Sequence, residues 1–201
     1  MSIASLIRDF DARKVVPVEL EDVEAALAAR GIKDEIYWFP ADINAEVLQG
    51  QLVHWEVEAD YEYPTDHTGA EVRKVAAIYY AESMDDPWRR LVGCKELLHV
   101  MDAPEARASS PEVVLKLTEK IILSPEFQDV VRDGYVTTTD RNAILQAVAV
   151  LFPWRARELF IGDGTLSNVE IAGLVDIPLR YVALVMSNSW PLIHDLLIEL
   201  D

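Results

Sequence analysis

The stretch that decides the fold is Trp88–Asp102, which reads WRRLVGCKELLHVMD. Asp86 and Pro87 come directly before it, and an N-cap aspartate followed by a first-turn proline predicts that a helix begins there. On this helix Lys95 and His99 are four residues apart and therefore share a face. We expect this face to carry the chemistry of the protein, because its polar groups have the spacing of a catalytic helix.

Glu96 lies next to Lys95, so the helix carries the pattern Lys-Glu-x-x-His. In the His-Glu-x-x-His motif of metallopeptidases, two histidines hold zinc and the glutamate activates a water molecule. Lys95 occupies the place of the first histidine, and a protonated amine has no lone pair for a metal. Deprotonation would require a lysine pKa about three units below its reference value of ~10.4. The pattern therefore predicts the scaffold of a metallopeptidase with a charge-neutralised, metal-free site.

The composition limits the partners of this chain. It has 201 residues and a formal net charge of −17, with 35 acidic and 18 basic side chains. A surface of this sign repels a phosphate backbone, so direct binding to nucleic acid is disfavoured. Cys94 is the only cysteine, which excludes an intramolecular disulfide and a thiolate zinc cluster. The sequence shows neither a membrane-spanning run nor a secretory signal, and we expect a cytoplasmic protein.

Three stretches have the character of strands. Residues 36–39 form a short apolar run, residues 54–63 alternate strictly between polar and apolar, and residues 75–80 are almost wholly apolar. The helix of residues 88–102 follows them. This order predicts an α+β fold in which a small, mostly antiparallel sheet packs on the motif helix.

Further helices are predicted around this centre. Apolar residues recur at helical spacing in residues 19–30 and, after a capping signal at Ser109, in residues 112–121. A third strong pattern begins at about residue 140 and ends at Leu151. Three short patterns end the chain, at residues 167–175, 178–186 and 192–200, and the first two have the cadence of a helix-turn-helix. From Phe160 onward, six acidic residues and one basic residue, Arg180, argue against DNA binding.

Between Lys74 and Trp190 the chain resembles the ImmA/IrrE family of zinc metallopeptidases. The matching parts, in order, are a strand before the motif helix, the motif helix, an apolar helix, a helix ending in a proline, and C-terminal helices of helix-turn-helix cadence. The family has a glutamate ligand three residues before an alanine and thirteen before a proline. Asp140, Ala143 and Pro153 stand at these positions.

The resemblance implies a zincin-like scaffold and a role for each site residue. Glu96 takes the position of the general base, His99 and Asp140 take positions of metal ligands, and Lys95 replaces the other histidine. Leu98 replaces a residue that is small in the family. The protonated amine of Lys95 is then expected to pair with Asp140 or Glu96. No cofactor is expected, although zinc would be the metal if the site were still competent.

The function implied by this resemblance is that of a degenerate metallopeptidase, a pseudoenzyme that binds a protein without cleaving it. Family members are commonly encoded beside repressors of phages or mobile elements, so the partner that the resemblance implies is a transcriptional repressor of this kind. The same resemblance divides the chain into a zincin-like α+β domain, residues 1–158, and a helix-turn-helix-like helical subdomain, residues 159–201.

Two other functions stay open. The first is an active metal-dependent endopeptidase that uses His99, Asp140 and a third ligand, His67 or His54. The second is a DNA-associated regulator that acts through the C-terminal helices. Each site residue also has a purely structural interpretation, as a surface lysine, a satisfied histidine or a helix-terminal carboxylate.

Overall fold

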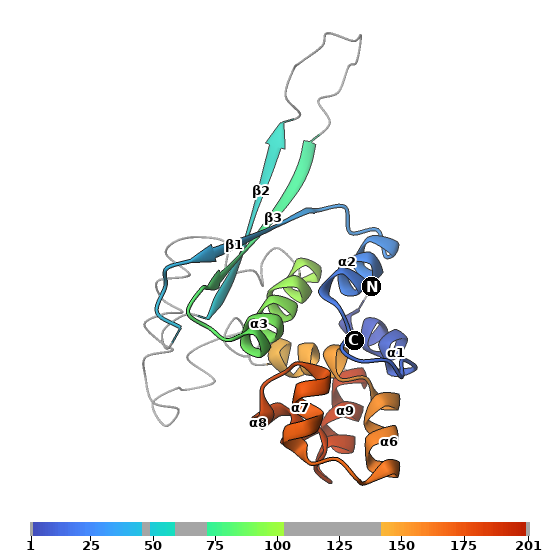
Figure 1. Ribbon diagram of the computed structural model, residues 1–201. Helices are drawn as coiled ribbons and strands as arrows, with labels where there is room; N and C mark the ends of the chain where they lie inside the picture. Colours follow the sequence, from blue (N-terminus) through green and yellow to red (C-terminus); the bar gives the residue numbers. More distant parts are fainter. Residues whose placement is uncertain (1, 46–48, 59–71, 103–141, 200–201) are drawn as a thin grey trace, which may run out of the picture.

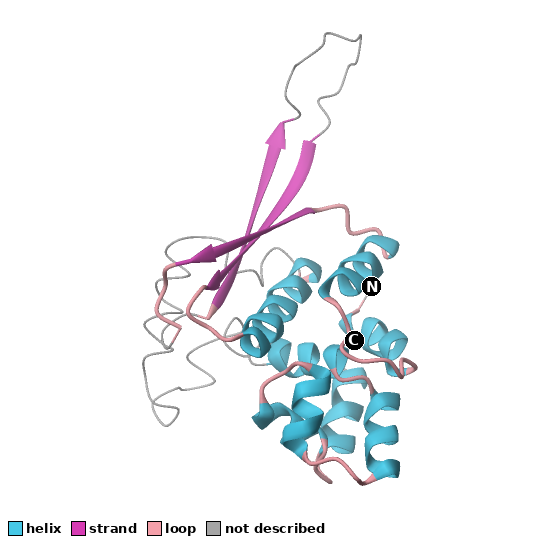
Figure 2. Cartoon of the chain, in the orientation of Figure 1, coloured by secondary structure: helices cyan, strands magenta, loops and turns pink. Residues whose placement is uncertain are grey.

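The computed structural model describes residues 2–45, 49–58, 72–102 and 142–199. Within these ranges the protein is α+β, with a small sheet on one side and helices on the other (Figures 1 and 2). The predicted class is therefore confirmed. None of the helices in these ranges combines the length and the apolar character that a membrane-spanning segment needs.

The sheet has three described strands in the order β1-β3-β2: β1 (Glu35–Ala41), β2 (Gly50–Glu58) and β3 (Val72–Ala81). The strands predicted at residues 36–39 and 75–80 are confirmed. For the strand predicted at residues 54–63, β2 begins earlier, at Gly50, and residues 59–63 lie outside the described ranges.

The sheet is mixed, whereas we expected a mostly antiparallel one. β2 pairs with β3 in antiparallel register, but β1 pairs with β3 in parallel register. Alternation of polar and apolar residues specifies the two faces of a strand, and it carries no information about the direction of the neighbouring strand.

The motif helix is α3 (Asp86–Leu98), continued by the 3-10 turn η1 (His99–Met101). Its N-cap is Asp85, whose Oδ1 accepts a hydrogen bond from the backbone N–H of Trp88 at 3.0 Å. The prediction that Asp86 caps the helix is wrong by one residue. α3 lies against the sheet, and Gly93 allows the helix to approach the indole of Trp38 on β1, because a Cβ there would lie 3.0 Å from its Cζ3.

α2 (Leu20–Ala29) lies beside α3, and the C-terminal helices lie on the side of α3 away from the sheet (Figure 1). α2 and the helical residues 142–151 confirm two predictions, although Asp140 and the helix predicted at 112–121 lie outside the described ranges. Three C-terminal helices also match their predicted positions: α7 (Asn168–Val175), α8 (Leu179–Val185) and α9 (Trp190–Glu199).

Two further helices were not predicted, α1 (Ile3–Asp11) and α6 (Trp154–Asp163). α1 packs against α6 and α9, so the start of the chain lies beside its C-terminal helices (Figure 1). His194 Nε2 lies 2.9 Å from Asp11 Oδ1 and joins α9 to the end of α1. The predicted domain boundary at 158/159 falls inside α6, and the division into two domains stays a prediction.

Cys94 lies in the hydrophobic core and is fully buried, as expected for a small core residue. Burial raises the pKa of its thiol from 9.0 to about 12, although the positive charge of Arg90 acts in the opposite direction. We therefore expect no alkylation of the folded protein by iodoacetamide at pH 8, and rapid alkylation in 8 M urea, because only the thiolate reacts. Mass spectrometry of the two reactions measures this difference.

The sign of the pH dependence follows from the same pKa. Because the folded-state value lies above the unfolded one, the contribution of Cys94 to stability is complete below about pH 9 and is lost as the pH rises toward about 12. If iodoacetamide labelled Cys94 in the folded protein at pH 8 as fast as in urea, the buried position of its thiol would be contradicted.

Candidate site on helix α3

One helical turn joins the two candidate site residues Lys95 and His99. The backbone N–H of His99 donates to the carbonyl oxygen of Lys95, so the chain keeps an α-helical turn up to His99. Side chains four residues apart in such a turn lie one above the other on the same face. The predicted shared face of Lys95 and His99 is therefore present, although α3 itself ends at Leu98.

Lys95 and Glu96 form a buried ion pair. The Nζ of Lys95 lies 2.8 Å from Oε1 of Glu96. Lys95 is only 9% exposed and Glu96 only 3%. The surface-lysine interpretation is therefore wrong. Of the two predicted partners of the amine, Glu96 is in contact with it, and Asp140 lies outside the described residues. Burial removes both charges from water. Loss of either side chain would therefore leave the other charge buried without a partner, which destabilises a folded protein strongly.

His99 is held by a carboxylate that we did not predict. Its Nδ1 lies 2.5 Å from Oδ2 of Asp102, and both side chains are largely buried. A hydrogen bond at Nδ1 fixes the orientation of the ring, as it does in metal-binding histidines that use Nε2. The spacing of three residues between His99 and Asp102 was the available signal.

Gly50, the first residue of β2, is a second residue that we did not predict. A Cβ at this position would lie 2.5 Å from Cγ1 of Val92 and 3.2 Å from Oε1 of Glu96. The end of β2 is therefore pressed directly onto the face of α3 that carries Glu96. Only a residue without a side chain permits this approach.

Replacement of Gly50 by alanine should destabilise the protein by about 2 kcal/mol, because the new methyl group overpacks a buried contact. Urea denaturation monitored by circular dichroism measures the change. Gly173→Ala is the matched control, since a Cβ there meets no atom within 4 Å, and a helical alanine should be neutral or stabilising. Equal stability of Gly50→Ala and wild type would contradict the close approach.

The other candidate ligands do not gather at this place in the described part of the chain. His54 lies on β2, four residues or about 14 Å along the strand from Gly50. Its Nδ1 is 3.4 Å from Oδ1 of Asp34. His67 and Asp140 lie outside the described residues.

The described residues do not fit the zinc centre that the resemblance implies. Zinc needs three protein ligands with lone pairs in a catalytic site. In the described ranges no three His, Cys, Asp or Glu side chains gather so that they could hold a metal ion. At the position of the first ligand stands the ammonium group of Lys95, already paired with Glu96.

The one basic residue of the helix-turn-helix-like pair α7 and α8 is Arg180, and it contacts another helix of the same chain. The guanidinium of Arg180, near the start of α8, lies 4.2 Å from the ring centroid of Trp88 on α3. Arg180 also donates a hydrogen bond to the hydroxyl of Tyr181 at 2.8 Å. A DNA-recognition helix needs basic side chains directed at phosphates, and in α8 the single candidate stacks on the motif helix.

Comparisons of the chain with models of protein families, with curated proteins and with solved structures find no match. Of the predicted site residues, Lys95 and Glu96 are in contact and His99 shares the face of Lys95.

Proposed function

We propose that this chain is a degenerate metallopeptidase of the ImmA/IrrE type, with a zincin-like scaffold, that acts in the cytoplasm by binding another protein. The observation that carries the proposal is the buried pair of Lys95 and Glu96. A helix with the order Lys-Glu-x-x-His has a positive charge where a zincin has a metal ligand. The same charge neutralises the glutamate that would otherwise act on a metal-bound water.

The rest of the motif helix supports this ancestry. His99 keeps the carboxylate partner at Nδ1 that a histidine ligand commonly has. α3 lies against a mixed sheet, with Glu96 beneath the start of β2. These features favour a site that once held a metal over an ordinary helix with a surface lysine.

The proposed partner is a transcriptional repressor of the kind found in phages and mobile elements. Binding without cleavage follows from a retained scaffold and a lost ligand. The net charge of −17 favours a protein partner with basic or neutral surfaces and disfavours direct contact with nucleic acid.

The proposal is tested with the purified full chain, prepared without added metal, and a candidate repressor of the phage or mobile-element type. We expect a complex on size-exclusion chromatography in which both chains stay intact, and well below one zinc ion per chain by elemental analysis. Addition of a chelator should leave the complex unchanged.

Four outcomes would overturn this proposal. A stoichiometric zinc or manganese content would contradict the metal-free site. Cleavage of the repressor that is abolished by Glu96→Gln and by chelators would establish the active endopeptidase. The absence of both complex and cleavage would remove the repressor as partner. A salt-dependent mobility shift of DNA by the chain alone would favour the DNA-associated regulator.

A further inference from the structure

A pocket of about 340 Å³ lies between α2, the start of β1 and the C-terminal part of α3. One face of α2 forms its longest wall, with residues at the helical spacing 21, 24, 25 and 28. Its size is that of a small-ligand pocket, large enough for one long side chain. The lining residues are Glu21, Glu24, Ala25, Leu27, Ala28, Ile32, Asp34, Ile36 and Leu97.

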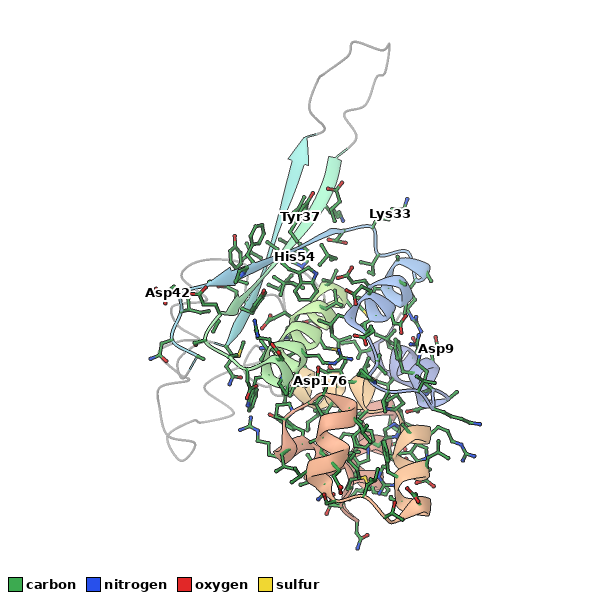
Figure 3. The ribbon with its side chains drawn as sticks, viewed as in Figure 1. Asp9, Lys33, Tyr37, Asp42, His54 and Asp176 are labelled. Carbon is green, nitrogen blue, oxygen red and sulfur yellow. The ribbon has the colours of Figure 1, made fainter. Side chains whose placement is uncertain are left out.

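The charged residues that line this pocket are all acidic. Glu21 and Glu24 also line a second pocket with Arg89 and Arg90, and these two arginines pair with Asp86 and Glu19. Glu21, Glu24 and Asp34 contribute carboxylates, and no lysine or arginine is among the lining residues. Lys33, which precedes Asp34, is exposed, and its side chain extends away from the helices and the sheet (Figure 3). The acidic rim is therefore not neutralised by a basic side chain of the pocket itself.

The partners of these carboxylates leave negative charge available. Glu24 Oε1 accepts a hydrogen bond from the indole Nε1 of Trp38 at 2.9 Å, and an indole donor carries no charge. Glu21 is exposed at the rim. Asp34 is paired with the imidazole of His54, which balances its charge only when protonated.

The floor of the pocket is apolar and firmly packed. Leu97 of α3 is fully buried and Leu27 of α2 is 2% exposed. Ile32 and Ile36 pack against the same core. Above these leucines, the apolar surface open to a ligand comes from Ala25, Ala28, Ile32 and Ile36. An apolar surface under a ring of carboxylates suits a group with an aliphatic stem and a cationic head, because the stem can cover the apolar side chains while the head reaches the rim.

We propose that this pocket receives an arginine or lysine side chain from a partner protein, in a segment where apolar residues flank the basic one. The charge of the rim and the apolar floor together select this occupant over an acidic or a purely apolar one. The inference rests on the proposed function as a protein-binding chain, and it names the chemistry of the bound segment.

The test uses acetylated, amidated pentapeptides with a central arginine between two leucines, and the same peptide with citrulline in place of arginine. Citrulline keeps the shape of the side chain and removes its charge. Titrations are followed by amide shifts in the ¹H–¹⁵N NMR spectrum of the full chain. We expect saturable shifts at Ala25, Ala28 and Ile32, and about tenfold weaker binding of the citrulline peptide.

Two double variants separate the pocket from general charge attraction. Glu21→Gln/Glu24→Gln removes two rim charges and keeps an oxygen for Trp38, and it should weaken arginine-peptide binding about tenfold. Asp195→Asn/Glu199→Gln makes the same change in net charge on exposed positions of α9 and should leave binding within about twofold.

Equal binding of the arginine and citrulline peptides would overturn the proposal. So would equal weakening by the two double variants, or shifts that scatter over the surface. A negative result for the peptides would leave the proposed function untouched, because the peptide titrations involve no metal, no repressor and no substitution at the Lys95 site.

Discussion

Lys95→His should bind about one zinc ion per chain, whereas the wild-type protein should bind none when both are purified in the same way. The substitution supplies an imidazole four residues before His99, on the same face of the helix. His99 already has a carboxylate at Nδ1, and Asp140 stands at the position of the family's third ligand. At a free zinc concentration one hundred times its Kd, bound metal should raise the free energy of unfolding by about 3 kcal/mol.

Elemental analysis and thermal unfolding with and without zinc measure this gain. Lys95→Met is the matched control, because it removes the amine without adding a ligand nitrogen. The double variant Lys95→His/His99→Ala should lose the zinc again. Failure of Lys95→His to take up zinc in a folded protein would show that residues 95 and 99 do not belong to an ancestral metal site.

Lys95→Met should lower the free energy of unfolding at pH 7 by about 3 kcal/mol, because it leaves the carboxylate of Glu96 buried without its cation. The side chains of Lys95 and Glu96 are 11% and 4% exposed, so water can replace little of the lost interaction. Urea denaturation monitored by tryptophan fluorescence measures the loss. A surface ion pair would give a change of less than about 1 kcal/mol.

A second substitution, at Glu96, separates the effect of its unpaired charge from the effect of the lost lysine side chain. In Lys95→Met/Glu96→Gln the buried side chain at position 96 is neutral, and part of the lost stability should return, since two neutral groups replace an unpaired charge. Additive losses in the double variant would show that Lys95 stabilises the fold by packing and not through Glu96.

Much of the fold could be predicted from local patterns. The apolar spacing in residues 20–29 and the Ser167–Glu170 capping box are complete within a few residues, and the structure has helices at both places. α1 could also have been predicted, because Ser2 caps it and Leu6, Ile7 and Phe10 line its buried face. These apolar residues recur at the spacing of one helical face, which is the signal for this helix.

Other features depend on contacts that no local pattern contains. Asp85 and Asp86 are equivalent as caps in the sequence, and the backbone geometry at the start of α3 selects Asp85. The parallel pairing of β1 with β3 depends on the path of the chain between them. A period of two residues is the same for both directions of pairing.

The candidate site divides in the same way. Lys95, Glu96 and His99 could be chosen from their spacing on one helix, and the possible pairing of Lys95 with Glu96 from charge alone. The role of Gly50 could not be predicted, because it arises where β2 meets Val92, more than forty residues away in the chain. Asp102 stands three residues after His99, a spacing at which side chains of one helical face meet, so this contact could also have been predicted.

The contact of α1 with the last helix has a consequence for synthesis on the ribosome. Arg8 donates a hydrogen bond to the carbonyl oxygen of Ile198, and Asp11 pairs with His194, at separations of 190 and 183 residues. The apolar face of the first helix therefore emerges long before α9, its binding surface, has been translated. We expect this face of α1 to stay without its packing partner on the nascent chain until α9 has left the ribosome.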